Sequence, residues 1–127
     1  MIKVSGMALG LLMLVAPAAV AVQWVVLGED NAKQVLLDWD SVQVRNGTAT
    51  FTQRVRSKPK APALTPQGTR RIDSRIEANC YSKLYRVLNY TAYGQSGKIV
   101  ERSRVPSGNQ VAAYNSPDYL AIAEVCE

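Results

Sequence analysis

From residue 24 onward, apolar side chains recur at every second position in short runs, and turn-forming residues separate the runs. This alternation is typical of antiparallel strands that bury one face of a sheet. The pattern predicts about six strands, and seven short segments are candidates for them: 24–28, 34–38, 41–45, 48–54, 70–80, 83–93 and 98–104. The sequence therefore predicts an α+β domain built mainly from one antiparallel sheet.

The clearest local signal is a hairpin between segments 41–45 and 48–54. Asn46 and Gly47 join the two arms, and this dipeptide tolerates the two positive φ angles of a tight hairpin turn. In the second arm, Ala49, Phe51 and Gln53 share one face, and threonines occupy the other. Beyond it, three prolines and a glycine between residues 58 and 68 predict an exposed loop, because proline cannot donate to a ladder.

The end of the chain changes from strand to helix periodicity. Ser116 can cap a free amide, Pro117 needs no donor at the first helical position, and Asp118 suits the positive end of the helix dipole. From there one helical stripe is predicted to face the core. Its members are Tyr119, Ile122, Ala123 and Cys126.

The two cysteines are expected to form a disulfide. Alternation places Cys80 on the same face as Ile72, Ser74, Ile76 and Ala78, which we expect to face the core. Cys126 lies on the buried stripe of the predicted helix. In an oxidising compartment, a Cys80–Cys126 bond would tie that helix to the sheet. Two free thiols or an intermolecular bridge are the alternatives.

The first residues predict export. Lys3 precedes an apolar stretch over 7–16, and Ala19-Val20-Ala21 offers small side chains to a signal peptidase. We expect a signal peptide over 1–21 and a mature domain over 22–127. A membrane anchor is the alternative, but the run is shorter than the roughly 20 residues of a spanning helix. Without a Cys at the cleavage site, no lipid anchor is expected, and the protein should be periplasmic, surface-located or secreted.

Composition excludes several kinds of chemistry. The chain has no His and only two Cys among 127 residues, which excludes a Ser-His-Asp triad, a Cys-His pair, a His metal cluster and a four-Cys zinc site. We therefore expect no enzyme activity, no catalytic residues, no cofactor and no metal. A small secreted hydrolase that uses Glu77 with Arg75 or Arg86 is the weaker alternative.

Positive charge is concentrated in the middle of the chain. The protein has 15 basic and 10 acidic residues, a net charge of +5, which favours anionic partners. The candidate binding residues are Arg54, Arg56, Lys58, Lys60, Arg70, Arg71 and Arg75, among which Asp73 is the one acid. They could bind sulfated glycans, acidic protein patches or lipid headgroups, and no specific nucleic acid is expected. The alternative is a solvated loop and a charged outer sheet face, which discourages edge-to-edge aggregation.

Two other groups of side chains have an ordinary structural interpretation. Strict alternation sends Tyr81 and Tyr85 to one face and Tyr90 to the other, so part of this aromatic set belongs to the core. Asp38 and Asp40 have the spacing of paired carboxylates on a strand, but no further acidic cluster accompanies them. Turn formation accounts for them better.

The order of several short motifs resembles the surface-adhesin protein E-like family of bacterial envelope proteins. The matching residues are Trp24, Leu37-Asp38-Trp39-Asp40-Ser41-Val42, Arg45-Asn46-Gly47, Arg75-Ile76-Glu77-Ala78-Asn79-Cys80, Tyr85-Arg86, Tyr90, Tyr93, Gly97 and Val125-Cys126. The resemblance covers nearly all of the mature chain.

This resemblance implies a six-stranded antiparallel sheet with a C-terminal helix fixed to its concave face by a disulfide. It also implies a non-enzymatic binding module that attaches to host extracellular matrix glycoproteins, and pairing of two copies into a homodimer through the sheet. A periplasmic structural or assembly component is the alternative function.

Overall fold

The computed structural model describes residues 23–127, so the predicted signal peptide lies outside the described residues. The strands are β2 (Trp24–Glu29), β3 (Lys33–Arg45), β4 (Thr48–Ser57), β5 (Arg71–Asn79), β6 (Leu84–Tyr93), β7 (Ile99–Ser103) and β8 (Gln110–Val111). The helices are η2 (Gln95–Gly97), a short 3₁₀ turn, and α2 (Pro117–Val125). Within 23–127, no helix has the length and apolar character needed to span a membrane.

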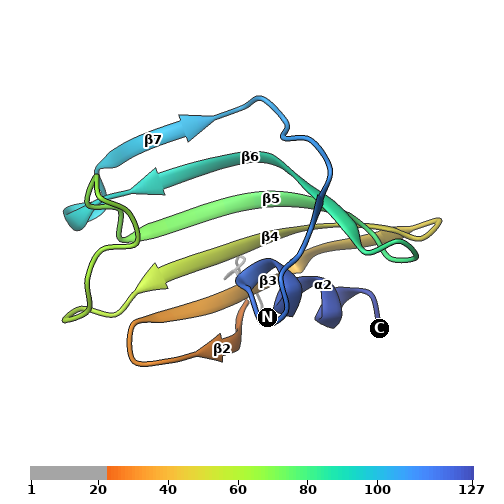
Figure 1. The fold of residues 1–127 in the computed structure, drawn as a ribbon, viewed down its shortest axis with the longest axis horizontal. Coiled ribbons are helices and arrows are strands. Elements are labelled where there is room, and N and C mark those ends of the chain that lie inside the picture. The colour runs from red at the N-terminus through yellow and green to blue at the C-terminus, as the bar shows by residue number, and fades with distance from the viewer. Residues whose placement is uncertain (1–22) are drawn as a thin grey trace, which may run out of the picture.

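The strands form one antiparallel sheet in chain order, from β2 at one edge to β7 at the other (Figure 1). The short β8 pairs with the first residues of β6, beside the stretch that pairs with β7. The prediction of separate strands over 34–38 and 41–45 was wrong: they form the single strand β3, whose register shifts between Asp38 and Gln43. At this irregularity the alternation of apolar and polar residues is interrupted, although the strand itself continues.

The hairpin prediction is confirmed. Asn46 and Gly47 both have positive φ, 53° and 78°, and join β3 to β4. On β4, Ala49, Phe51 and Gln53 are buried, as the alternation predicts. Residues 58–70 form the connection from β4 to β5 without regular structure.

The core lies between one face of the sheet and α2, which packs against β2, β3 and β4. From the sheet it contains Leu37, Phe51, Ile76 and Tyr85, and from the helix Ala121, Ile122 and Val125. Burial of these apolar side chains is the main stabilising contribution. The opposite face, which α2 does not cover, is called the open face below.

Helix α2 begins as predicted but presents a different side to the sheet. Ser116 accepts a hydrogen bond from the Tyr119 amide, and Pro117 and Asp118 occupy the first turn. The fully buried helical residues are Ala121, Ile122 and Val125, whereas Tyr119, Ala123 and Cys126 are half-buried. The predicted stripe is therefore right for Ile122 and for Cys126, which packs against the core, but the buried side is rotated from Tyr119 and Ala123 towards Ala121 and Val125. Because Leu120, Ala121 and Val125 are apolar too, periodicity could not select the side.

The predicted disulfide is present. Cys80 and Cys126 are bonded, with their Cα atoms 5.4 Å apart and 46 residues between them in sequence. The bond joins the residue after β5 to the C-terminal end of α2. Closing a loop of this length stabilises a fold by roughly 4 kcal/mol in the chain-entropy model.

Candidate binding surface

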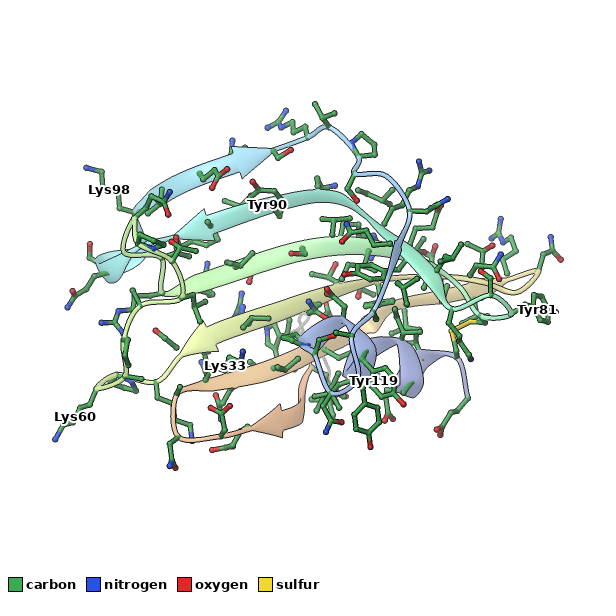
Figure 2. The ribbon with its side chains drawn as sticks, in the orientation of Figure 1. Lys33, Lys60, Tyr81, Tyr90, Lys98 and Tyr119 are labelled. Carbon is green, nitrogen blue, oxygen red and sulfur yellow. A yellow bond between two sulfur atoms is a disulfide. The ribbon has the colours of Figure 1, made fainter. Side chains whose placement is uncertain are left out.

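Three connections of the sheet lie together at one end. Because alternate connections of an antiparallel meander lie at the same end, residues 30–32, 58–70 and 94–98 are neighbours there. We call this the basic end, since it carries Lys33, Arg56, Lys58, Lys60, Arg70, Arg71 and Lys98 with the acids Glu29 and Asp30. Figure 2 shows Lys60 and Lys98 extending outward at this end and Tyr81 at the other.

Charge at the other end of the sheet is balanced. Arg45 and Lys83 lie there with Glu124 and Glu127 of the disulfide-tethered C-terminus. The molecule is thus electrically polarised along its strands. The sequence analysis missed Lys33 and Lys98, because Lys33 begins β3 and Lys98 lies in the 94–98 connection, and only the meander brings them beside the 58–70 loop.

Two of the predicted binding residues lie on the open face, within the sheet. Arg54 donates two hydrogen bonds to Asp73, of 2.8 and 3.0 Å, and its guanidinium carbon is 4.1 Å from the centre of the Trp24 ring. Arg75 donates to the Ser41 carbonyl and to the Thr52 hydroxyl. Both arginines therefore bond neighbouring strands to each other. These bonds also fix the shape of the open face beside the basic end.

The remaining predicted residues lie at the basic end itself. Lys58 forms a 2.6 Å ion pair with Glu29, and Arg70 donates to the Ser57 hydroxyl and the Ala61 carbonyl. The bond from Lys58, with a second from Gln34, lowers the pKa of Glu29 below its ordinary value. Lys60 is exposed.

Arg56, Arg71 and Tyr93 form a row across three neighbouring strands. Arg56 is the register partner of Arg71, which is in turn the partner of Tyr93. The Arg71 guanidinium lies over the Tyr93 ring, 3.9 Å from its centre, and its Nε is 3.6 Å from an oxygen of Asp73. Arg56 donates from its own Nε to the Gln34 side chain at 2.8 Å.

A hollow of about 390 Å³ lies beside this row. Basic, hydroxyl and backbone groups line it, and the lining contains no acidic residue: Arg56, Ser57, Pro59, Arg70, Arg71, Tyr93, Gly94, Gln95, Ser96 and Gly97. A second hollow adjoins it and shares Arg56, Ser57 and Pro59, with Lys58 and Gln34 on its other side. Such a site can attract and hold an anion.

The alternative sites of the sequence analysis have other surroundings. Glu77 accepts a 2.9 Å hydrogen bond from Arg86, its register partner, in an ion pair on the open face. Asp38 accepts a hydrogen bond from the Asp40 amide within β3, where the register with β4 shifts, so these aspartates lie at an irregularity of one strand and not at a turn between two strands. Among residues 23–127, no group of three His, Cys, Asp or Glu side chains is placed to hold a metal ion.

The face assigned to Tyr90 was wrong. The register of β5 and β6 shifts between Arg75 and Ile76, so that β6 has one extra residue at this point. The bulge reverses the alternation beyond it. Tyr85 and Tyr90, opposite Ala78 and Ser74, consequently share the face that carries α2.

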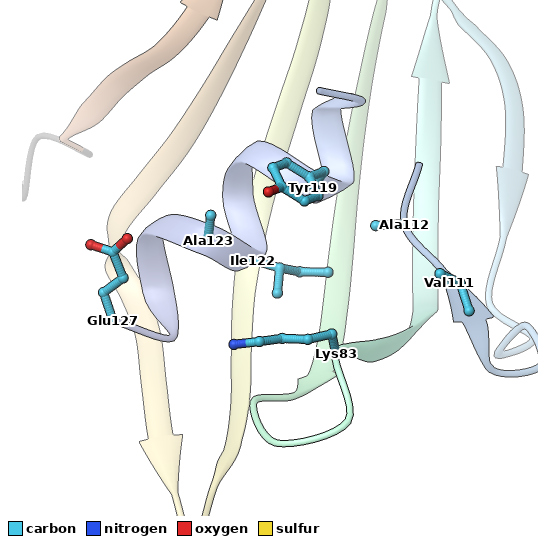
Figure 3. Close-up of a pocket in the computed structure, with 7 residues that line it drawn as sticks. All are labelled: Lys83, Val111, Ala112, Tyr119, Ile122, Ala123 and Glu127. Carbon is cyan, nitrogen blue, oxygen red and sulfur yellow. The ribbon is translucent and has the colours of Figure 1, made fainter. Parts of the chain in front are cut away.

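A mainly apolar hollow of about 330 Å³ lies between α2 and β8. Figure 3 draws its lining: Lys83, Val111, Ala112, Tyr119, Ile122, Ala123 and Glu127. It offers apolar contact with one charge of each sign, and it is separate from the basic end.

Solved structures of Haemophilus influenzae protein E share this fold. A crystal form II structure of Haemophilus influenzae protein E superimposes with a TM-score of 0.54 at 14% identity, over 87% of this chain and 91% of that one. The structure from the non-typeable organism gives 0.53 at 16% identity, over 87% and 79%. No curated protein sequence matches significantly.

The model of one protein family matches residues 24–127. This span contains every strand that the structure describes, helix α2, both cysteines and the whole basic end. The chain therefore belongs to the surface-adhesin protein E family, and this membership supports an adhesin-like binding role.

Proposed function

We propose that this protein is a non-enzymatic, envelope-associated or secreted binding module that attaches through its basic end to anionic groups of host matrix glycoproteins. The observation that carries the proposal is the gathering of seven basic side chains at one end of the sheet, from two connections and from the ends of the strands beside them. Membership of a surface-adhesin family supports both the binding role and an envelope location.

The basic end attracts anionic partners because its charges are clustered. Within about 8 to 10 Å, which is the Debye length at physiological salt, clustered charges act together on a partner. Glu29 is already paired with Lys58, so most of the positive charge of the basic end remains available. We expect this excess to increase the association rate with anionic partners and to make binding weaken as salt rises.

The predicted binding residues have two roles in this proposal. Arg56, Lys58, Lys60, Arg70 and Arg71 contact the partner, together with Lys33 and Lys98. Arg54 and Arg75 hold the adjoining open face in shape through the bonds to Asp73, Ser41 and Thr52.

Binding to immobilised heparin and to matrix glycoproteins tests the proposal. We expect the mature protein to be retained and to elute at moderate salt. Replacing Lys58, Lys60, Arg70 and Arg71 by glutamine should abolish retention. A matched variant that neutralises Arg45, Lys83, Arg102 and Arg104, away from the basic end, has the same net charge and should be retained almost normally. Equal behaviour of the two variants would reject the basic end as the binding surface.

Export is the second part of the proposal. A signal peptide over residues 1–21 would deliver the domain to the periplasm, the cell surface or the medium. Mass spectrometry of the mature protein should then find Val22 at its N-terminus, and cell fractionation should find it outside the cytoplasm. An uncleaved cytoplasmic protein would contradict this part.

Pairing of two copies through the sheet is a further candidate, as is assembly with an envelope partner. The edge strands support it: Val25 and Val26 on β2, and Ile99 and Val100 on β7, are exposed apolar residues. Analytical ultracentrifugation of the mature protein tests pairing, and Val26→Lys on the β2 edge should return a dimer to the monomer. Co-purification with a membrane partner after mild crosslinking would favour assembly instead.

A further inference from the structure

Two arginines lie directly opposite each other at the basic end. Arg56 of β4 and Arg71 of β5 are register partners, so both side chains leave the open face from neighbouring positions. Directly opposed residues of an antiparallel pair have Cβ atoms about 4.5–5.5 Å apart, and like charges in this arrangement are destabilising. The pair therefore costs stability unless a negative charge lies near it.

The two nearest acids are shared with other basic side chains. Asp73 makes its two short hydrogen bonds to Arg54 and is 3.6 Å from Arg71. Glu29 is paired with Lys58. Within residues 23–127, no carboxylate lies within ion-pair distance of Arg56, whose recorded partner is the neutral Gln34 side chain. The opposed pair thus lacks a full counter-charge.

The Arg71 guanidinium is held ready for a ligand. Stacking on Tyr93 fixes its plane. Its buried Nε lies 3.6 Å from Asp73, which is too far for a hydrogen bond, and it has no hydrogen-bond partner in the described part of the chain. A stacked guanidinium still presents donors along its edge, where a sulfate or phosphate can be bound by two parallel bonds. The hollow beside it is lined by Arg56, Arg70, Ser57 and Ser96 as well.

We propose that this hollow binds one tetrahedral oxyanion, a sulfate or phosphate ester, between Arg56 and Arg71. The inference rests on the proposed function, because it names the chemical group that the basic end recognises. A carboxylate has two oxygens in one plane and satisfies one guanidinium. A sulfate ester or a phosphate monoester has three free oxygens, enough to accept from Arg71, Arg56 and Arg70 at once.

Calorimetry on the mature protein at low salt tests this site. The probes are a fully sulfated heparin disaccharide, the same disaccharide after desulfation, inorganic phosphate, and vesicles containing phosphatidic acid, whose headgroup is a phosphate monoester. We expect the sulfated disaccharide or the phosphate-bearing probes to bind, and the desulfated disaccharide not to bind. Which of them binds more tightly identifies whether the natural group is a glycan sulfate or a phosphate.

Single substitutions locate the site. Arg56→Gln and Arg71→Gln should each weaken the preferred probe at least tenfold. Arg86→Gln is the matched control, because Arg86 also lies on the open face and pairs with an acid across neighbouring strands, but away from the hollow. It should change affinity less than twofold. Equal effects of all three substitutions would overturn the site.

Thermal unfolding is a second test, and it distinguishes a ligand-binding role of Arg56 from a purely structural one. Arg56→Gln removes the like-charge contact, so without ligand it should unfold at the wild-type temperature or above it while binding more weakly. Sulfate should raise the unfolding temperature of the wild type more than that of Arg56→Gln.

The outcomes separate this inference from the proposed function. If Arg56→Gln and Arg71→Gln bind the probes like the wild type while the four-residue variant loses heparin, the oxyanion site is wrong and the basic end stands. If heparin and matrix proteins are not bound but inorganic phosphate is, in a manner that depends on Arg71, the oxyanion site stands and the proposed adhesion is wrong.

Discussion

The hydroxyl of Tyr85 donates a 2.6 Å hydrogen bond to the carboxylate of Asp118. Tyr85 is buried in β6, and Asp118 lies in the first turn of α2, so the bond joins the helix to the sheet at the opposite end of α2 from the disulfide. Gln53 of β4 donates to the other oxygen of the same carboxylate at 3.0 Å. The short terminal helix is thus fixed at both ends.

Removal of the Tyr85 hydroxyl should destabilise the protein. We expect Tyr85→Phe to lower the free energy of unfolding by about 1.5–3 kcal/mol, the range for hydrogen bonds to charged groups. Tyr90→Phe is the control, because Tyr90 donates to Glu101 over the same 2.6 Å, but at an exposed site. It should cost less than about 1 kcal/mol. Urea unfolding curves measure both, and equal losses would contradict a special role for the buried bond.

The same tyrosine should make the fold sensitive to alkali. Burial, and then the bond to Asp118, raise the pKa of Tyr85 well above its ordinary value. Above about pH 10 the unfolded chain loses this proton while the folded chain keeps it, so stability falls as pH rises, by up to about 1.4 kcal/mol per pH unit. Tyr85→Phe should remove this part of the slope in unfolding measured at several pH values above 10. An unchanged slope would show that other groups cause the alkaline loss.

Loss of the disulfide should release α2. We expect Cys80→Ser with Cys126→Ser to lower the free energy of unfolding by roughly 4 kcal/mol in the chain-entropy model, because a helix of nine residues is marginal by itself. Reductant should have the same effect on the wild type and none on the double variant. Limited proteolysis should cleave the reduced protein first within residues 117–125; an initial cut elsewhere would argue against the helix as its least stable part.

The features that sequence predicted well are those that local chemistry determines. Asn46 and Gly47 specify a hairpin because few residues tolerate positive φ. A helix start is marked by Ser116, which accepts a hydrogen bond from a free amide, by Pro117, which has no amide hydrogen to satisfy, and by the charge of Asp118. The Cys80–Cys126 bond followed from only two cysteines on two predicted core faces. None of these inferences needed the distant contacts of the fold.

The features that sequence missed depend on packing and topology. Periodicity could not select the side of α2 that contacts the sheet, because apolar residues lie on several sides of the helix. Examples are Leu120, Ile122 and Val125. The bulge in β6 reversed the face of Tyr90, and no residue there is a specific bulge signal. At the basic end, Lys33 and Lys98 join the 58–70 loop only because the strands run as a meander.

Gly47 provides a direct test of the hairpin. Its φ of 78° is unfavourable for a side chain, so Gly47→Ala should cost about 1–2 kcal/mol. A Cβ there would also lie 2.1 Å from the Tyr81 ring. Tyr81 is 83% exposed and can move, so the backbone should account for most of the loss. The double variant Gly47→Ala with Tyr81→Ala should therefore recover little stability in thermal unfolding; full recovery would assign the cost to the ring.

Asp73 should matter more to stability than either arginine beside it. It bonds to Arg54 and lies 3.6 Å from Arg71, so Asp73→Asn leaves two neighbouring arginines without a counter-charge, whereas Arg54→Gln leaves Asp73 still close to Arg71. Because both members of the Arg54–Asp73 pair are about one-fifth exposed, solvent screens part of the effect. We expect losses of about 1–2 kcal/mol for Asp73→Asn and less than about 1 kcal/mol for Arg54→Gln.

Salt distinguishes the electrostatic origin of this difference from a loss of packing. Sodium chloride screens like-charge repulsion, so the gap between Asp73→Asn and Arg54→Gln should narrow as salt rises in urea unfolding. Sulfate at equal ionic strength should narrow it further, since a bound oxyanion would supply the charge that Asp73 no longer provides. A gap that stays constant in both salts would mean that Asp73 acts through hydrogen-bond geometry alone.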